Sequence, residues 1–115
     1  MPGHRSPRSV RELAPVEAAW IGAMIDGEGS IYRCTGQVGH RMEFGNTEVE
    51  LVATMLRVVG AGKVYLLNNR ASNLVGKLPI WRWYLYPAND VAALIEQIAP
   101  YSIKAQKWLP YVETV

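Results

Sequence analysis

Cysteine and long apolar runs are what this 115-residue chain has least of. Its single cysteine, Cys34, excludes a disulfide within the chain and leaves no zinc-ligand pattern, and nothing places a base beside it for thiol catalysis. The longest apolar run, from Ala18 to Ile25, is far shorter than the ~20 residues of a membrane span, and the N-terminus lacks a signal-peptide core. We therefore expect a soluble, intracellular protein with no membrane partner.

Net charge is also small, and its distribution is more informative than its size. The formal charge of +2 is too weak to indicate nucleic-acid binding by itself. Residues 30 to 86, however, hold seven basic residues against three acids, a local excess of four positive charges. The composition, half of it apolar, fits one globular domain over residues 15–115. Residues 1–14, rich in proline and arginine, predict a flexible basic arm.

Apolar periodicity predicts an α+β domain. The first expected helix covers residues 15–26, and the second runs from a capping box at Thr47 and Glu50 to residue 59. A third runs from a cap at Asn89 or Asp90 to residue 98, and a fourth covers 104–112 with a bend at Pro110. The expected strands are 30–35, 40–44, 63–67 and 80–86, and Gly36 and Gly39 mark the turn between the first two. Alternation places Arg82, Tyr84 and Tyr86 opposite Trp81, Trp83 and Leu85, and Arg41 and Glu43 opposite Met42 and Phe44. We therefore expect one sheet face on the helices and one open polar face.

The first predicted helix carries a stripe of small residues. Ala19, Gly22, Ala23 and Asp26 recur at i, i+3, i+4 and i+7. An interior glycine costs a helix ~1 kcal/mol relative to alanine. The stripe therefore indicates that another backbone approaches this face closely.

Two acids follow where the same helix ends. Asp26 and Glu28 lie at the C-terminus, whose partial negative charge is unfavourable for acids, so a bound cation would remove the conflict. Gly27 and Gly29 permit the left-handed conformations that end a helix, and they expose carbonyl oxygen. The stretch can therefore offer a hard-oxygen metal site.

The nine residues IGAMIDGEG, from Ile21 to Gly29, resemble the signature of the LAGLIDADG homing endonucleases, with glutamate as the acid at the eighth position. Asn46-Thr47-Glu48, Gly60-Ala61-Gly62 and Ala99-Pro100-Tyr101 agree with that family in order and spacing. The resemblance implies an α-β-β-α-β-β-α fold with a four-stranded antiparallel sheet. It also implies a homodimer in which two motif helices pack at the two-fold axis through Ala19, Gly22, Ala23 and Asp26.

For function, the resemblance implies a homing-type endonuclease of intron or intein mobility, which hydrolyses one phosphodiester in each strand of a near-palindromic double-stranded DNA site with Mg²⁺. Glu28 then binds the metal together with the Gly27 carbonyl, and Asp26 is the companion acid. Glu48 matches a polar residue near the catalytic waters, and Lys104 matches a basic helper, although spacing one residue short leaves Lys107 as an alternative. The expected DNA-binding side chains are Arg33, Arg41, Lys63, Arg70, Lys77, Arg82 and Tyr84.

Other functions fit the residues less completely. A DNA- or RNA-binding relative without cleavage activity, such as a splicing helper or regulator, would keep the basic sheet and the dimer helix, but Glu28 argues against it. A calcium-binding domain would need the oxygen ligands at positions 5 and 12 of an EF-hand loop, which this stretch lacks. A purely structural module would leave the acids and the basic sheet without a use.

Overall fold

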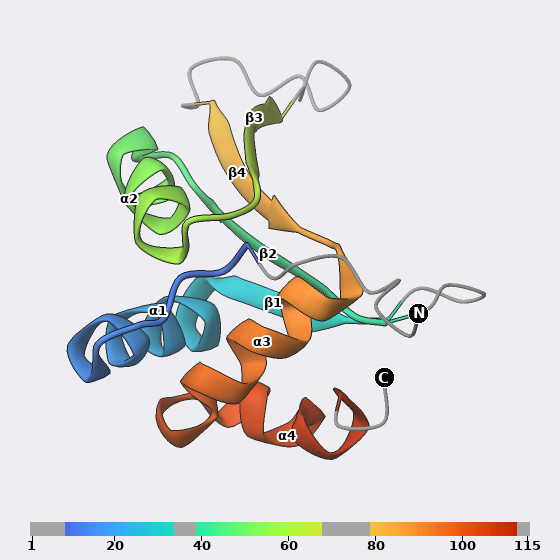
Figure 1. The fold of residues 1–115 in the computed structure, drawn as a ribbon. Coiled ribbons are helices and arrows are strands. Elements are labelled where there is room, and N and C mark those ends of the chain that lie inside the picture. The colour runs from blue at the N-terminus through green and yellow to red at the C-terminus, as the bar shows by residue number, and fades with distance from the viewer. Residues whose placement is uncertain (1–8, 34–38, 68–78, 113–115) are drawn as a thin grey trace.

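A computed structural model describes residues 9–33, 39–67 and 79–112. The chain runs through α1 (Pro15–Glu28), β1 (Gly29–Tyr32), β2 (Arg41–Asn46), α2 (Val49–Val59), β3 (Lys63–Leu67), β4 (Ile80–Leu85), α3 (Ala88–Ile98), the 3-10 turn η2 (Ala99–Tyr101) and α4 (Ile103–Val112), as Figure 1 shows. The expected fold class and order of elements are confirmed, and η2 is an addition. Within the described ranges, no helix has the length and apolar character needed to cross a membrane.

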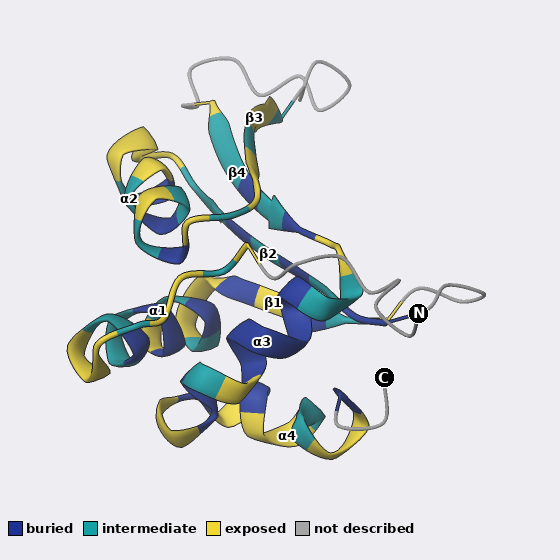
Figure 2. Ribbon diagram, in the orientation of Figure 1, coloured by how far each residue is buried: buried dark blue, intermediate teal, exposed yellow. Residues whose placement is uncertain are grey.

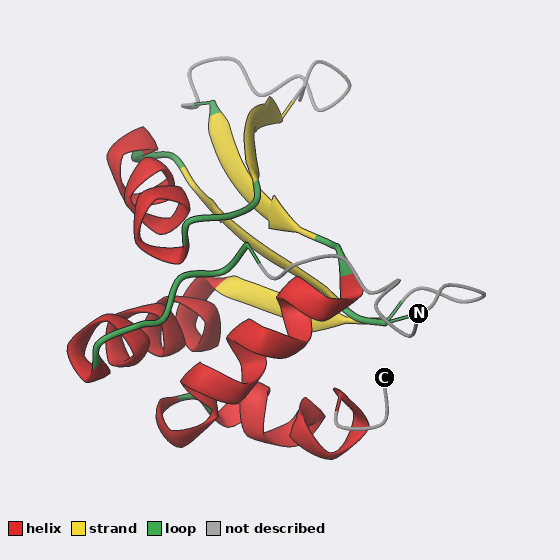
Figure 3. Cartoon of the chain, in the orientation of Figure 1, coloured by secondary structure: helices red, strands yellow, loops and turns green. Residues whose placement is uncertain are grey.

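The sheet is antiparallel with strand order β1-β2-β4-β3. Its register pairs Met42 with Leu85 and Phe44 with Trp83, and all four side chains are buried. The helices lie together on this side of the sheet (Figures 2 and 3) and complete the core with residues such as Ile21, which is fully buried. The period-two alternation in the strands therefore produces the expected apolar face, and it leaves the opposite face open.

The end of α1 differs from expectation. The helix continues to Glu28, so Gly27 is helical, and Gly29 follows it in an extended conformation with φ of −109°. The left-handed helix end expected at Gly27 and Gly29 is therefore wrong. Glycine is needed at position 29 for another reason, because a Cβ there would lie 2.8 Å from the Glu43 carbonyl oxygen. This close approach joins the motif helix to the sheet.

Two helix starts also differ. Glu48, and not Thr47, is the residue before α2, where the Asn46 side-chain oxygen accepts a hydrogen bond from the Glu48 backbone N–H at 2.8 Å. This turn by an asparagine side chain delays the helix and replaces the capping box. Pro87 precedes α3, so the expected asparagine or aspartate cap is wrong as well. The last helix, α4, runs from Ile103 to Val112 and includes Pro110, close to the expected 104–112.

The segment before α1 is bound to the body of the domain. The Arg11 backbone N–H donates to the Val59 carbonyl at 2.9 Å, and Arg11 Nη1 donates to the Val58 carbonyl at 2.6 Å. The Leu13 backbone N–H donates to Gln97 Oε1 at 2.7 Å. Residues 9–14, which we expected to belong to a flexible arm, thus hold α2 and α3 together. Residues 1–8 of that arm lie outside the described ranges.

Candidate active site and nucleic-acid interface

Glu28, the last residue of α1, presents an exposed carboxylate that is held by one side chain of the sheet. Asn46 Nδ2, at the end of β2, donates to both Glu28 oxygens at 2.6 and 3.2 Å. Because Asn46 also accepts the Glu48 backbone N–H, it connects Glu28 to the start of α2. The structure thus places two expected site residues, Glu28 and Glu48, on either side of Asn46. In the sequence, Asn46 stood out only as part of a helix start.

The oxygen donors at this corner suit a hard cation such as Mg²⁺. Glu28 is exposed, and Gly27 beside it is open enough that a Cβ would meet nothing within 4 Å. Among the described residues, no group of three or more histidine, cysteine, aspartate or glutamate side chains could hold a metal ion. The described residues of one chain therefore supply at most part of a coordination sphere.

Asp26 is bonded to the start of α4. Its Oδ1 accepts from Ser102 Oγ at 2.8 Å and from the Lys104 N–H at 3.1 Å, and its Oδ2 accepts from the Ile103 N–H at 2.8 Å. Ser102 Oγ in turn accepts the Ala105 N–H at 3.1 Å. Partial burial raises the pKa of Asp26, but the hydrogen bonds from Lys104, Ile103 and Ser102 outweigh it and hold that pKa below its ordinary value. Asp26 thus stabilises the positive end of α4.

Lys104 supplies the cation at the end of α1. Its ammonium donates to the Gly29 carbonyl at 2.7 Å and to the Ile25 carbonyl at 3.3 Å. Lys107 is exposed, and its ammonium lies 5.6 Å from the centre of the Trp108 ring. The structure therefore brings Lys104, rather than Lys107, to the motif. The unfavourable charge of two acids at a helix C-terminus is relieved within the chain by this lysine and by the start of α4.

The small residues of α1 divide between two surroundings. Gly22 is buried, and a Cβ there would lie 2.9 Å from the Tyr101 carbonyl oxygen, so the closely approaching backbone is η2 of the same chain. Ala23 and Gly27 are exposed, as is Val16 at 76%. This corrects the expected stripe, because Gly22 and Asp26 have partners within one chain. The face left open on α1 runs from Val16 past the half-buried Ala19 to Ala23 and Gly27.

A shallow groove borders that open face of α1. It has a volume of about 310 Å³ and is lined by Val16, Glu17, Trp20, Thr54 and Val58, so it lies between α1 and α2. Its lining is largely apolar. Val16 belongs both to this groove and to the open face of α1, so the two surfaces adjoin.

The open face of the sheet carries arginines that contact neighbouring tyrosine and glutamate side chains. Arg41 Nη1 donates to the Tyr84 hydroxyl, and its guanidinium lies 5.4 Å from the centre of the Tyr86 ring, which stacks on Tyr84. Arg82 Nη1 lies 3.0 Å from Glu43 Oε1. Three expected DNA-binding residues, Arg41, Arg82 and Tyr84, are thus on one surface. Glu43 is a polar member of it that sequence reasoning left out of the site, although strand alternation had placed it there.

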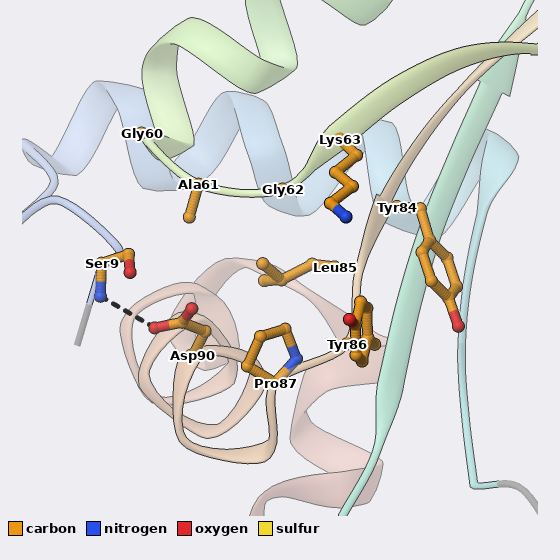
Figure 4. Close-up of a pocket in the computed structure, with 10 residues that line it drawn as sticks. All are labelled: Ser9, Gly60, Ala61, Gly62, Lys63, Tyr84, Leu85, Tyr86, Pro87 and Asp90. Carbon is orange, nitrogen blue, oxygen red and sulfur yellow. Dashed lines mark hydrogen bonds between the residues drawn. The ribbon is translucent and has the colours of Figure 1, made fainter. Parts of the chain in front are cut away.

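Lys63 lies at the β3 edge of the same face. It borders a pocket of about 370 Å³, and Figure 4 shows its ammonium directed into that pocket, across from Asp90. The Asp90 carboxylate accepts the Ser9 N–H at 2.8 Å, which fixes the pocket wall. Lys63 is thus exposed at this pocket, next to Tyr84 and Tyr86.

Arg33, another expected DNA-binding residue, is not on this surface. Arg33 follows the end of β1 and is exposed. Its charge contributes to lowering the pKa of His40, a buried residue immediately before β2. By strand alternation, Arg33 lies on the same side of the sheet as Ile31, away from the open face. Arg70 and Lys77 lie outside the described residues.

This α+β architecture, with its motif helix leading into a four-stranded antiparallel sheet, is the LAGLIDADG homing endonuclease fold. Two solved structures of the homing endonuclease I-CvuI are similar to it. One, bound to its target Sro1.3 in the presence of 2 mM Ca, has a TM-score of 0.64 and 14% identity over 86% of this chain and 67% of that one. The other, with the I-CreI target C1221 and 2 mM Mg and its DNA not cleaved, has a TM-score of 0.61 and 15% identity over 85% and 66%. The chain thus spans about two thirds of their length.

No protein-family model matches the chain, and no curated protein matches it. At these identities the likeness is one of fold.

Proposed function

We propose that this protein is a sequence-specific DNA endonuclease that works as a homodimer with Mg²⁺ and hydrolyses one phosphodiester in each strand of a near-palindromic duplex. The observation that carries the proposal is an exposed acid, Glu28, fixed by Asn46 beside a sheet whose open face bears arginines and tyrosines. Such a face suits phosphates and base edges, and the acid suits a metal. Structures of the same fold, those of I-CvuI, are complexes with DNA in the presence of Ca or Mg, which supports the proposal.

The chain's own groups have distinct roles in this reaction. Glu28 and the Gly27 carbonyl would hold the metal, which when bound supplies Lewis-acid activation of water and of the phosphate. Asn46 orients the Glu28 carboxylate through bonds to both of its oxygens. Glu48, the residue before α2, would accept a proton from water in the same corner. Lys104 fixes the carbonyls on either side of Glu28 and so holds the end of the motif in place.

A second copy completes the proposed site. One chain provides a single exposed acid at the motif, whereas cutting both strands requires two. The open face of α1, with Val16, Ala23 and Gly27, is small and apolar enough for another such helix to approach. A symmetric contact there would bring the two Glu28 residues near each other at the two-fold axis.

The test is a cleavage selection on a randomised duplex library, with and without Mg²⁺, using the wild type, Glu28→Gln and Glu50→Gln. Both substitutions remove one negative charge from an exposed side chain, but Glu50 lies on α2 and has no role in the proposed site. We expect Mg²⁺-dependent cleavage of a nearly palindromic site by the wild type and by Glu50→Gln. Glu28→Gln should lose at least a hundredfold in rate, in the range that removal of one important transition-state group costs. Wild-type cleavage rates in Glu28→Gln refute the metal role.

A non-cleaving DNA-binding protein is the second candidate. One observation favours it: the Asn46 amide covers both Glu28 oxygens, the atoms that a metal would use. In the same selection, a duplex that is bound and enriched but never cut with Mg²⁺ identifies this function.

A further inference from the structure

Glu43 is an acid in the middle of the open sheet face. In the register it lies between Ser30 of β1 and Tyr84 of β4. Its Oε1 is 3.0 Å from Arg82 Nη1, and its Oε2 accepts a hydrogen bond from the Tyr32 hydroxyl. A carboxylate here repels phosphate and neutralises the arginine beside it. A surface that only attracts a DNA backbone has no need for such a group.

We infer that Glu43 and Arg82 together read a single G·C base pair in the major groove, an inference that rests on the proposed DNA-binding function. The groove edge of guanine presents two acceptors, N7 and O6, and the paired cytosine presents the N4 amino donor next to them. An arginine followed by a carboxylate presents the complementary order of donors and acceptor. An A·T pair offers acceptor, donor, acceptor and methyl in that order, which does not match.

Both side chains can contact a base without breaking their own bond. A guanidinium has five N–H donors, and the ion pair is made through one terminal nitrogen, Nη1. Each Glu43 oxygen has two lone pairs, of which the bonds to Arg82 and Tyr32 use one apiece. The Glu43 side chain is 19% exposed and that of Arg82 is 32% exposed, so both reach the surface.

The surroundings fix the pair before DNA arrives. The Tyr32 hydroxyl holds one carboxylate oxygen while Arg82 holds the other, so the carboxylate has little rotational freedom. Side chains ordered in advance lose less conformational entropy on binding. The neighbouring Arg41 is likewise ordered by Tyr84. The surface is therefore built for a defined geometry, as base recognition requires.

The test is a binding selection on a randomised duplex library without Mg²⁺, using the full chain as wild type, Glu43→Gln and Glu50→Gln. Both variants lose one negative charge, but only position 43 touches Arg82. We expect the wild type and Glu50→Gln to enrich G·C at one position of each half-site. Glu43→Gln should lose that preference about tenfold, since one good base contact is worth that much discrimination.

A third variant, Arg82→Lys, keeps the charge and removes the planar fork, so it should lose preference at the same position. Circular dichroism checks that each variant is folded. Identical base profiles for the wild type, Glu43→Gln and Arg82→Lys overturn the inference. So does an equal gain of affinity in both glutamate variants with no change in preference, because that outcome reflects charge alone. A wild type that enriches no duplex overturns the proposed function itself.

Discussion

Replacing Asp26 with asparagine tests how the motif helix is connected to the rest of the chain. The carboxylate accepts hydrogen bonds from Ser102 Oγ, Ile103 N and Lys104 N. Asparagine has one acceptor oxygen, so one backbone donor at the start of α4 would face an amide N–H₂ group and lose its partner. A hydrogen bond to a charged group contributes ~1.5–3 kcal/mol, and we therefore expect Asp26→Asn to lower the free energy of unfolding by about 2 kcal/mol at pH 7.

The pH dependence of that loss is a second measure of the same interaction. The pKa of Asp26 is lowered from 3.8 in the folded protein, so its stabilisation is fully present above pH 3.8 and disappears as the pH falls through the depressed value. The difference between wild type and Asp26→Asn, measured by urea unfolding, should shrink correspondingly in acid. Glu12→Gln is the matched control, because Glu12 is exposed and the loss of its charge should change stability by less than ~0.5 kcal/mol. Equal stability of Asp26→Asn and wild type at pH 7 would refute this reasoning.

Two further predictions concern the dimer and a buried histidine. Ala23→Glu should lower the mass measured by light scattering to that of one chain and leave the free energy of unfolding nearly unchanged. Gly22→Leu should instead lower the free energy of unfolding, because its side chain would meet the Tyr101 carbonyl. An unchanged mass for Ala23→Glu would exclude the open face of α1 as the interface. His40 is 3% exposed, and burial, with a contribution from Arg33, lowers its pKa from 6.5. The contribution of neutral His40 to the free energy of unfolding is therefore complete above pH 6.5, and it is lost on acidification by at most ~1.4 kcal/mol per pH unit. His40→Phe should flatten the pH profile of stability below pH 6.5. An unaltered profile would contradict this.

The fold was predictable because its determinants are local. Alternation in Met42 and Phe44, and in Trp83 and Leu85, specified which sides of β2 and β4 are buried, and the structure pairs these residues directly. The same alternation placed Arg82 on the open face. Hydrophobic periodicity and turn residues depend only on residues close together in the sequence, so both can be recognised from the sequence alone.

The contacts at the site were less predictable because they join distant segments. Glycine at position 22 indicated a close backbone, but not that the backbone belongs to η2 of the same chain. The acids at the end of α1 indicated a cation, and Lys104 was expected near the reaction chemistry, whereas its ammonium binds the helix carbonyls. Asn46 changed from a helix-opening residue to the partner of Glu28. Local patterns reveal that a group needs a partner, and tertiary packing decides which one it finds.

The partners of the motif helix also determine when its end can take shape during synthesis. The Ile25 and Gly29 carbonyls and the Asp26 carboxylate bond to residues 75 to 79 positions later in the chain. At roughly 5–20 residues per second, a ribosome needs several seconds to make that intervening stretch. Until Lys104 has emerged and α4 has docked, these groups lack the partners that α4 and Lys104 supply. A nascent chain that lacks Lys104 would therefore carry the complete motif without the contacts that hold its end in the finished fold.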